Sequence, residues 1–343
     1  MRITLLTAVP LGLSLSLTPP AVAASTEATP TPTPALPATP SVPVSPTPAV
    51  PSPAVPSPTE PVPATGSTSA ESATGTIWPD APDARVASSR KGPRGVHARS
   101  AYLVDETSRQ VLWGRNAGTR RPIGSITKVM TAVVVLRSGG LDRRIRIRRA
   151  DLGYAIARHG STARLRPGDR FTARELLTAM LVPSGCDAAS ALANAYGPGR
   201  ARFVRKMNRT ARSLGLRSTH YNDPAGLPPS PGWSTARDLV ALGRYAMRFP
   251  DFRAAVARDA YLSRATRTHG RNVWINTDTL LGDYPGLIGI KSGYTSEAGY
   301  SFLFAARRSG RTLIGAVLNS SRTRRTARFH DAARILDWGF GWK

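Results

Sequence analysis

Residues 121–137 read Arg-Pro-Ile-Gly-Ser-Ile-Thr-Lys-Val-Met-Thr-Ala-Val-Val-Val-Leu-Arg. The Pro-Ile-Gly segment at the start is a helix start signal and the Gly-Gly pair at 139–140 is a stop signal, so we predict a helix from Ser125 to about Arg137. Because its interior is apolar on every side, this helix should be buried on most faces. The run of β-branched valines would also suit a strand.

Strands are predicted on both sides of this helix. Ala101–Asp105 and Gln110–Trp113 have the pattern of two short strands joined by a turn, and Tyr300–Ala305 and Thr312–Leu318 are strongly apolar strands near the end of the chain. A last helix is predicted from about Thr326 to Gly339. Strands at both ends with helices between them favour a mixed α/β (α+β) fold, in which an antiparallel sheet is flanked by helices and joined to an all-helical region.

The middle of the chain supplies that helical region. Periodic apolar positions predict helices over Ala173–Val182, Asp187–Tyr196, Ala201–Leu214 and Thr235–Arg248. Arg143–Arg149 alternates arginine and isoleucine with a period of two, which is typical of a charged strand at the edge of a sheet.

The first ninety residues differ from the rest in composition. A basic start, an apolar run over residues 3–17 and small residues at 21–24 are typical of a secretory signal peptide, residues 1–23. An uncleaved membrane anchor is the alternative, although the run is shorter than the ~20 residues that a span needs. Residues 24–90 are rich in Pro, Thr, Ser and Ala and are predicted to be a disordered linker. We therefore expect a secreted protein, extracellular or associated with a cell wall, whose folded domain is residues 91–343.

Charge and cysteine content exclude several classes of protein. The 47 Lys and Arg against 21 Asp and Glu give a net charge of +26, and residues 91–343 carry +28, which predicts polyanionic surroundings. The single cysteine, Cys186, excludes a disulfide framework and a cysteine-ligated zinc site. The five histidines show no metal spacing, so no metal or cofactor is expected.

Lysine is rare, and two of the five lysines lie in short motifs. Unlike arginine, a desolvated lysine can lose its proton and act as a base. In Ser125-Ile-Thr-Lys128, residues three apart share one helix face, so the Lys128 amine can reach the Ser125 hydroxyl. Ser125 would also lie at a helix N-terminus, where backbone N–H groups stabilise a developing negative charge.

Two further motifs are each weak in isolation. Lys291-Ser-Gly293 follows a predicted strand entry, where a glycine lets a ligand backbone lie close to the strand. Ser184-Gly-Cys186 lies at the junction of two predicted helices, where a hydroxyl could relay a proton from the Lys128 amine.

Together, the three motifs resemble the pattern of the penicillin-recognising serine enzymes. From about Ser100 to the C-terminus the chain resembles the serine D-alanyl-D-alanine carboxypeptidases, the low-molecular-mass penicillin-binding proteins. The likeness includes Leu103–Asp105, Arg121–Ala132, Leu181–Ala189, Asn222–Leu227, Ser234–Leu239, Gly289–Thr295 and Leu336–Phe340. It implies a β-lactamase/DD-peptidase-like fold for residues 91–343, peptidoglycan stem peptides as substrate and β-lactam antibiotics as covalent inhibitors.

The resemblance implies acyl transfer through a covalent intermediate. Ser125 would attack the D-Ala-D-Ala carbonyl, and Lys128, kept neutral by burial and by the positive Lys291, would accept its proton. Ser184 would pass the proton to the departing D-Ala, and the backbone N–H groups of Ser125 and Tyr294 would form the oxyanion hole. Water or an amine then releases the acyl group, so hydrolysis and transpeptidation both remain open.

The same resemblance implies the substrate-binding residues: Lys291, Ser292, Gly293, Tyr294, Thr295, Cys186 and Arg328. Cys186 stands where the family usually has Asn, a form found in actinobacterial members, and Ser292 stands where Thr is usual. Arg328 is placed before the last helix. We expect a half-buried Cys186 beside Ser184, so that a thiol reagent would slow acylation by crowding the cleft.

Two alternatives differ in class. A class A β-lactamase shares the first and third motifs but needs Asp in the second motif and a deacylating Glu, and no Glu occurs between Cys186 and Lys291. A non-catalytic polyanion binder would use the net charge and Arg143–Arg149. Export, and the lack of a basic motif interleaved with aromatic residues, favour anionic wall polymers over nucleic acid as its ligand.

Overall fold

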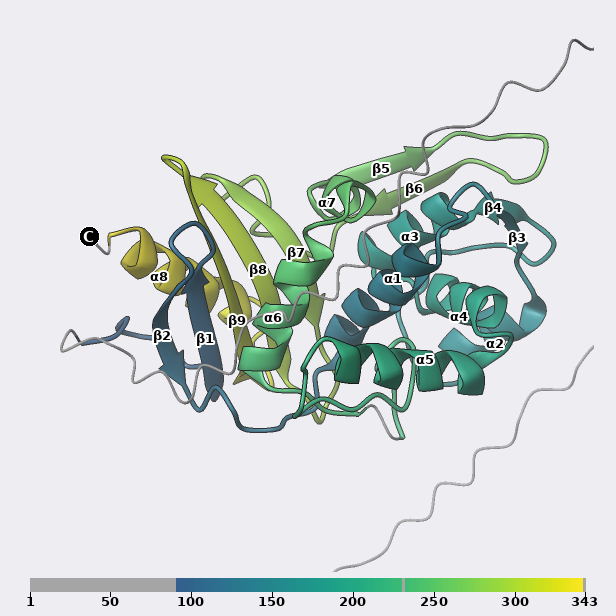
Figure 1. Cartoon of the computed structure of the whole chain (residues 1–343). Helices are drawn as coiled ribbons and strands as arrows, with labels where there is room; N and C mark the ends of the chain where they lie inside the picture. Colours follow the sequence, from purple (N-terminus) through teal and green to yellow (C-terminus); the bar gives the residue numbers. More distant parts are fainter. Residues whose placement is uncertain (1–90, 230–231, 342–343) are drawn as a thin grey trace, which may run out of the picture. The chain divides into compact units, whose positions relative to one another are not determined.

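The computed structural model describes residues 91–229 and 232–341 (Figure 1). The predicted signal peptide and linker lie outside these residues. Within the described ranges, no helix combines the length and apolar character needed to span a bilayer.

The main sheet joins the two ends of the domain. Its strands are β1 (Ser100–Asp105), β2 (Gln110–Arg115), β7 (Leu287–Gly293), β8 (Tyr300–Arg308) and β9 (Arg311–Ser321). They pair antiparallel in the order β2-β1-β9-β8-β7. The predicted antiparallel sheet is therefore confirmed.

Helices cover both faces of this sheet. On one face, Phe302 and Phe304 lie in a buried cluster with Ile335 of α8 (Ala327–Phe340). On the other face, alternate residues such as Leu303 lie in the larger core with α1 (Thr127–Ser138) and α6 (Ala236–Ala246). Because successive side chains of a strand point to opposite faces, a sheet covered on both sides reads as continuously apolar strands.

The helical region lies beside the sheet and surrounds α1 (Figure 1). Its helices are α2 (Arg149–Ile156), α3 (Ala173–Leu181), α4 (Cys186–Tyr196), α5 (Arg200–Ser213) and α7 (Pro250–Val256). Residues 127–136 of α1 are all buried, as predicted from their apolar character on every side. Its valine run is helical, and a short 3₁₀ turn, Gly124–Ile126, precedes it, so Ser125 lies in that turn rather than in the α-helix.

The predicted strand at Arg143–Arg149 is wrong in extent. Strand β3 covers only Arg144–Arg146, and it pairs with β4 (Arg170–Thr172) in a two-stranded sheet apart from the main one. The chain turns into α2 because an Asp151 carboxylate oxygen accepts a hydrogen bond from the Arg148 N–H at 3.0 Å, which satisfies a donor at the helix start. A second hairpin, β5 (Ala260–Ser263) and β6 (Asn272–Ile275), was not predicted.

Candidate active site

Ser125 lies in a turn held between two other backbone segments. Gly124 has φ +51°, and a Cβ there would lie 3.2 Å from the Tyr294 backbone. Gly226 has φ +77°, and a Cβ there would lie 2.0 Å from the Gly124 carbonyl oxygen. Glycine is thus required at both positions for two reasons: each has a positive φ, and at each a Cβ would crowd another backbone segment.

Lys128 is fully buried and its amine points at the serine. Its Nζ donates hydrogen bonds to Ser125 Oγ at 2.8 Å and to the Ala225 carbonyl oxygen at 3.3 Å. The contact predicted from the three-residue spacing is present. At this distance the amine is within reach of the hydroxyl proton, which is the geometric requirement for a general base.

The loop that supplies the Ala225 carbonyl is itself held in place. The Asp223 carboxylate accepts hydrogen bonds from the Tyr154 hydroxyl at 2.7 Å and from the backbone N–H groups of Ala225 and Leu227 at 2.7 and 3.1 Å. Burial, and then the charge of Asp223, raise the pKa of Tyr154, so its hydroxyl stays a proton donor.

Ser184 lies in a strained loop between α3 and α4. It is buried and has φ +65°, a region that costs a non-glycine residue free energy and persists only where the surroundings impose it. The Asp187 carboxylate accepts from the Ala163 and Leu165 N–H groups at 2.9 and 3.3 Å, and the Cys186 N–H donates to the Ser161 carbonyl at 2.8 Å. These bonds tie the loop to the segment at 161–165.

Lys291 comes from strand β7 and is also buried. Its Nζ donates to Thr277 Oγ1 at 3.3 Å, and Thr277 Oγ1 shares a hydrogen bond of 2.9 Å with Ser292 Oγ. Burial, followed by the positive charges of Lys128 and Arg328, lowers the pKa of Lys291 well below its usual value. Thr277 was missed in the sequence analysis, because a threonine between two strands has no local signal for this role.

The third motif packs directly on the first. A Cβ on Gly293 would lie 2.6 Å from the Ile123 carbonyl oxygen, so only glycine lets β7 approach the turn at Ser125 this closely. The Thr277 N–H donates to the Val182 carbonyl at 3.1 Å, which links the second motif to the same region. All three motifs therefore lie together.

Sequence and structure comparisons agree with this arrangement. Residues 86–322 match the family described as D-alanyl-D-alanine carboxypeptidase, peptidase family S11. The chain belongs to this family.

Relatives within the family are close over most of the chain. The D-alanyl-D-alanine carboxypeptidase of Streptomyces sp. (strain K15) is 40% identical over 257 residues, which cover 71% of this chain and 88% of the relative. One from Mycobacterium tuberculosis is 38% identical and covers 77% of this chain and 88% of the relative. The crystal structure of the Streptomyces K15 DD-transpeptidase, 40% identical, matches with a TM-score of 0.69 and covers 74% of this chain and all of that one. The predicted DD-peptidase-like fold is confirmed.

Two expectations about the family motifs change in the structure. Cys186 is fully buried rather than half-buried, because α4 begins at this residue and its first turn faces the core. Its Sγ lies 3.8 Å from the Ser184 carbonyl oxygen, and a Cβ on Gly160 would lie 2.9 Å from Sγ. The thiol is therefore enclosed, and a thiol reagent has no open cleft to crowd at this position.

Arg328 lies in the first turn of α8 rather than before it. It is 4% exposed and donates to the Gly293 carbonyl oxygen at 3.3 Å. Burial, and next the charge of Arg325, lower its pKa to about 10. The structure thus places this guanidinium at the third motif of the family.

Thr295 and Tyr294, the remaining predicted binding residues, differ in their surroundings. Thr295 Oγ1 accepts a hydrogen bond from the Ala298 N–H at 3.0 Å, which stabilises the turn after β7. Tyr294 is 44% exposed, and its ring stacks on Tyr300 with centroids 4.2 Å apart.

Asp278 is a buried carboxyl group that no sequence motif indicated. One oxygen accepts the Leu280 N–H at 3.0 Å, and the other has no hydrogen-bond partner among the described residues. Burial raises the pKa of Asp278 to about 6, against the opposing effects of that hydrogen bond and of the charges of Lys291 and Arg328. No group of three or more His, Cys, Asp or Glu side chains that could hold a metal ion occurs within residues 91–229 and 232–341.

Proposed function

We propose that this protein is a serine D-alanyl-D-alanine carboxypeptidase that acts on peptidoglycan stem peptides through an acyl-enzyme. The observation that carries this proposal is the buried Lys128 amine, 2.8 Å from the Ser125 hydroxyl. Neighbouring motifs supply a second hydroxyl at Ser184 and a second buried lysine at Lys291.

Acylation proceeds by proton transfer and bond exchange. Ser125 Oγ bonds to the carbonyl carbon of the D-Ala-D-Ala peptide, and its proton passes to Lys128 Nζ. The carbon–nitrogen bond then breaks, and Ser184 relays a proton to the departing D-Ala amine. Backbone N–H groups of Ser125 and Tyr294 stabilise the oxyanion, and the close approach of Gly124 to the Tyr294 backbone supports this role.

The terminal carboxylate of the substrate is bound by the cationic side of the site. Thr277 links Lys291 and Ser292 there by hydrogen bonds, and Arg328 donates to the Gly293 carbonyl oxygen of the same motif. Burial and neighbouring cations disfavour the charged form of Lys291. A substrate carboxylate that binds there stabilises the charged form, and the two groups then form an ion pair.

The acyl group is released to water or to an amine. The similar protein of solved structure from Streptomyces K15 is a DD-transpeptidase, which favours transpeptidation as a second candidate activity beside hydrolysis. Both activities use the same acyl-enzyme.

Labelling with a fluorescent penicillin tests the acyl-enzyme. The wild type should be labelled, and Ser125→Ala should not be, whereas Ser138→Ala, on an exposed position at the end of α1, should label normally. D-Ala release with and without an amine acceptor then separates hydrolysis from transpeptidation. An unlabelled wild type would remove the proposal, and rapid loss of the label to water would favour a β-lactamase.

We also propose that the protein is exported by a cleaved signal peptide and associates with anionic polymers of a cell wall. The composition of residues 1–23, the substrate class and the net charge of +28 on residues 91–343 support this proposal. Mass spectrometry of the mature protein identifies its N-terminus and so tests cleavage near Ala23. Co-sedimentation with purified walls measures association, which should be unchanged in Ser125→Ala.

A further inference from the structure

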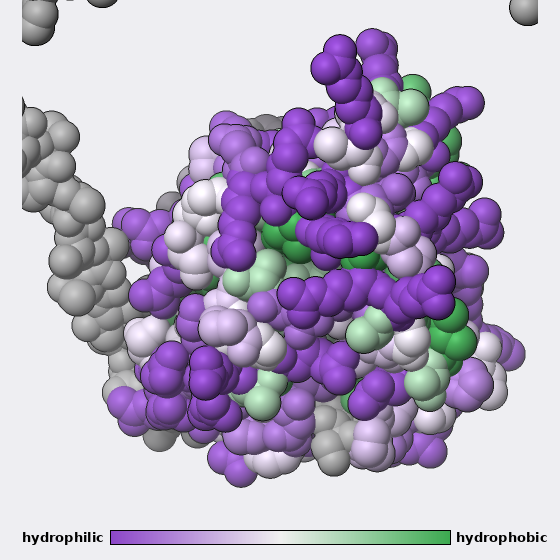
Figure 2. Space-filling model, turned by 90° about the vertical axis from the view of Figure 1, so that its right-hand side faces the viewer, coloured by the Kyte–Doolittle hydropathy of each residue, from purple (hydrophilic) through white to green (hydrophobic). Residues whose placement is uncertain are grey.

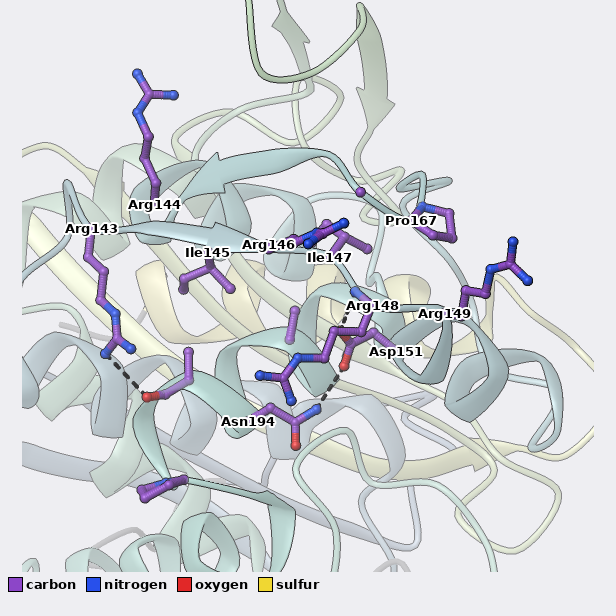
Figure 3. Close-up of a pocket in the computed structure, with 14 residues that line it drawn as sticks. Arg143, Arg144, Ile145, Arg146, Ile147, Arg148, Arg149, Asp151, Pro167 and Asn194 are labelled. Carbon is purple, nitrogen blue, oxygen red and sulfur yellow. Dashed lines mark hydrogen bonds between the residues drawn. The ribbon is translucent and has the colours of Figure 1, made fainter.

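Five arginines line a cavity that shares no lining residue with the candidate active site. The cavity has a volume of about 870 Å³ and lies between β3, the start of α2 and the end of α4 (Figure 3). Its arginines are Arg143, Arg144, Arg146, Arg148 and Arg149. It opens on the side of the molecule that hydrophilic side chains largely cover (Figure 2).

The backbone holds these arginines outward. Ile145 and Ile147 are buried, so the alternate residues Arg144, Arg146 and Arg148 lie on the exposed side of the same extended segment. Alternate residues of an extended chain repeat at about 6.6–6.8 Å. The segment therefore presents a row of cationic groups and not a single point charge.

Two of the five arginine side chains donate hydrogen bonds to protein acceptors, and the other three can bind a ligand. Arg143 donates to the Ala195 carbonyl oxygen at 3.2 Å, and Arg144 donates to Thr268 Oγ1 at 2.9 Å. Within the described part of the chain, the guanidinium groups of Arg146, Arg148 and Arg149 have neither a hydrogen-bond acceptor nor a carboxylate partner.

The one carboxylate in the lining does not neutralise this charge. Asp151 is 1% exposed, and its oxygens accept from Ser190 Oγ, Asn194 Nδ2 and the Arg148 N–H, at 2.8, 2.8 and 3.0 Å. Five guanidinium groups against one enclosed carboxylate leave a strongly positive cavity.

We propose that this cavity binds a phosphodiester-linked anionic polymer, an inference that rests on the proposed action at a cell wall. Guanidinium groups bind phosphate oxygens in pairs, and a row of them suits a linear chain with one charge per repeat. The lining contains no aromatic residue on which a nucleic-acid base could stack, so a base-free polymer fits better than single-stranded nucleic acid. The site tethers the enzyme to the wall while the catalytic groups remain free.

The test compares two triple variants of the full chain. One replaces the cavity arginines, with Arg146→Gln, Arg148→Gln and Arg149→Gln. The control makes the same charge change on the exposed side of α5, with Arg202→Gln, Arg205→Gln and Arg209→Gln. Binding is measured with purified polyglycerol phosphate, inorganic phosphate and single-stranded DNA, and with purified walls before and after chemical removal of their phosphodiester polymers.

The cavity variant should lose at least tenfold in affinity for polyglycerol phosphate and for intact walls. The slope of log affinity against log salt concentration should become less steep by about two to three, because each phosphate contact that is lost removes the release of about one counterion. The control variant should stay within about twofold of the wild type, and stripped walls should bind weakly.

Four results would overturn the proposal: wild-type affinity in the cavity variant, an equal loss in the control variant, undiminished binding to stripped walls, or equally tight binding of inorganic phosphate or DNA. Penicillin labelling of the same samples separates this inference from the proposed function. Normal labelling of the cavity variant is expected, and an unlabelled wild type that still binds polymer would reject the enzyme assignment alone.

Discussion

At the scale of single residues, the candidate site brings three basic side chains together in a buried place. Lys128, Lys291 and Arg328 interact there, and the burial of Lys291 is the largest cause of its lowered pKa. Among the described residues, Asp278 is a carboxyl group whose charge acts on Lys291, and its own pKa is raised. An arriving substrate carboxylate would therefore stabilise the charged form of Lys291, which burial and the neighbouring basic groups disfavour.

Asp278→Asn should remove the free-energy cost of burying an ionised carboxylate, a cost that depends on pH. Burial raises the Asp278 pKa from 3.8 to about 6, so the folded protein binds this proton more tightly than the unfolded chain. The contribution of this group to stability is present below pH ~4 and is lost as the pH rises through about 6. The variant should therefore be more stable than the wild type at pH 7.5, by on the order of 1–2 kcal/mol, with a smaller difference at pH 4.5.

Urea unfolding at several pH values measures this difference. Asp283→Asn, an exposed aspartate in the same segment, is the control and should show no such trend. A less stable Asp278→Asn at pH 7.5 would instead show that the ionised carboxylate is needed to balance Lys291 and Arg328.

Gly226→Ala should disturb the turn that holds Ser125. A Cβ at Gly226 would overlap the Gly124 carbonyl oxygen at 2.0 Å, in addition to the cost of φ +77°. Gly282→Ala is the matched control, because Gly282 has φ +87° with no atom within 4 Å of a Cβ. The control should lose about 1–2 kcal/mol, and Gly226→Ala should lose more and label with penicillin at least tenfold more slowly. Equal labelling rates in the two variants would contradict the role given to this contact.

At the scale of elements, a local capping motif fixes the start of α3. Thr172-Ala-Arg-Glu175 is a capping box, in which Thr172 Oγ1 accepts the Glu175 N–H at 3.1 Å and Glu175 accepts the Thr172 N–H at 2.8 Å. The predicted start of this helix at Ala173 is confirmed. In contrast, the alternation at Arg143–Arg149 predicted a longer strand than β3, because Asp151 caps a helix that begins inside the pattern.

Thr172→Ala should lower stability by about 1 kcal/mol, the usual value of a side-chain cap. Thr326→Ala is the control, since Thr326 is the N-cap of α8 but its side chain makes no cap hydrogen bond. Thermal unfolding compares the two, and penicillin labelling should be unchanged in both. A similar loss in the two variants would show that the cap hydrogen bond contributes little to α3.

At the scale of the whole molecule, charge excess opposes folding. Residues 91–343 carry a net +28, and repulsion between like charges destabilises a compact state until salt screens it.

Raising NaCl from about 20 to 150 mM should therefore increase the melting temperature by a few degrees, on the order of 1 kcal/mol. Sodium sulfate at the same ionic strength serves as the comparison. An equal rise of the melting temperature in both salts indicates screening, and a larger rise in sulfate indicates anion binding. A lower melting temperature at 150 mM NaCl would contradict the role given to charge repulsion.

From the sequence alone, most strands of the main sheet and the long helices could be predicted, together with contacts that lie within one helical turn, but not the β5–β6 hairpin or the extent of β3. The Ser125–Lys128 pair follows from residues three apart, and the strongly apolar strands follow from burial on both sheet faces. Three features depend on tertiary packing: the Lys128 amine donates to the Ala225 carbonyl oxygen, 97 residues away, Thr277 bridges Lys291 and Ser292, and Cys186 is enclosed. Contacts within one turn are set by backbone periodicity, whereas contacts between distant segments depend on how the whole core packs.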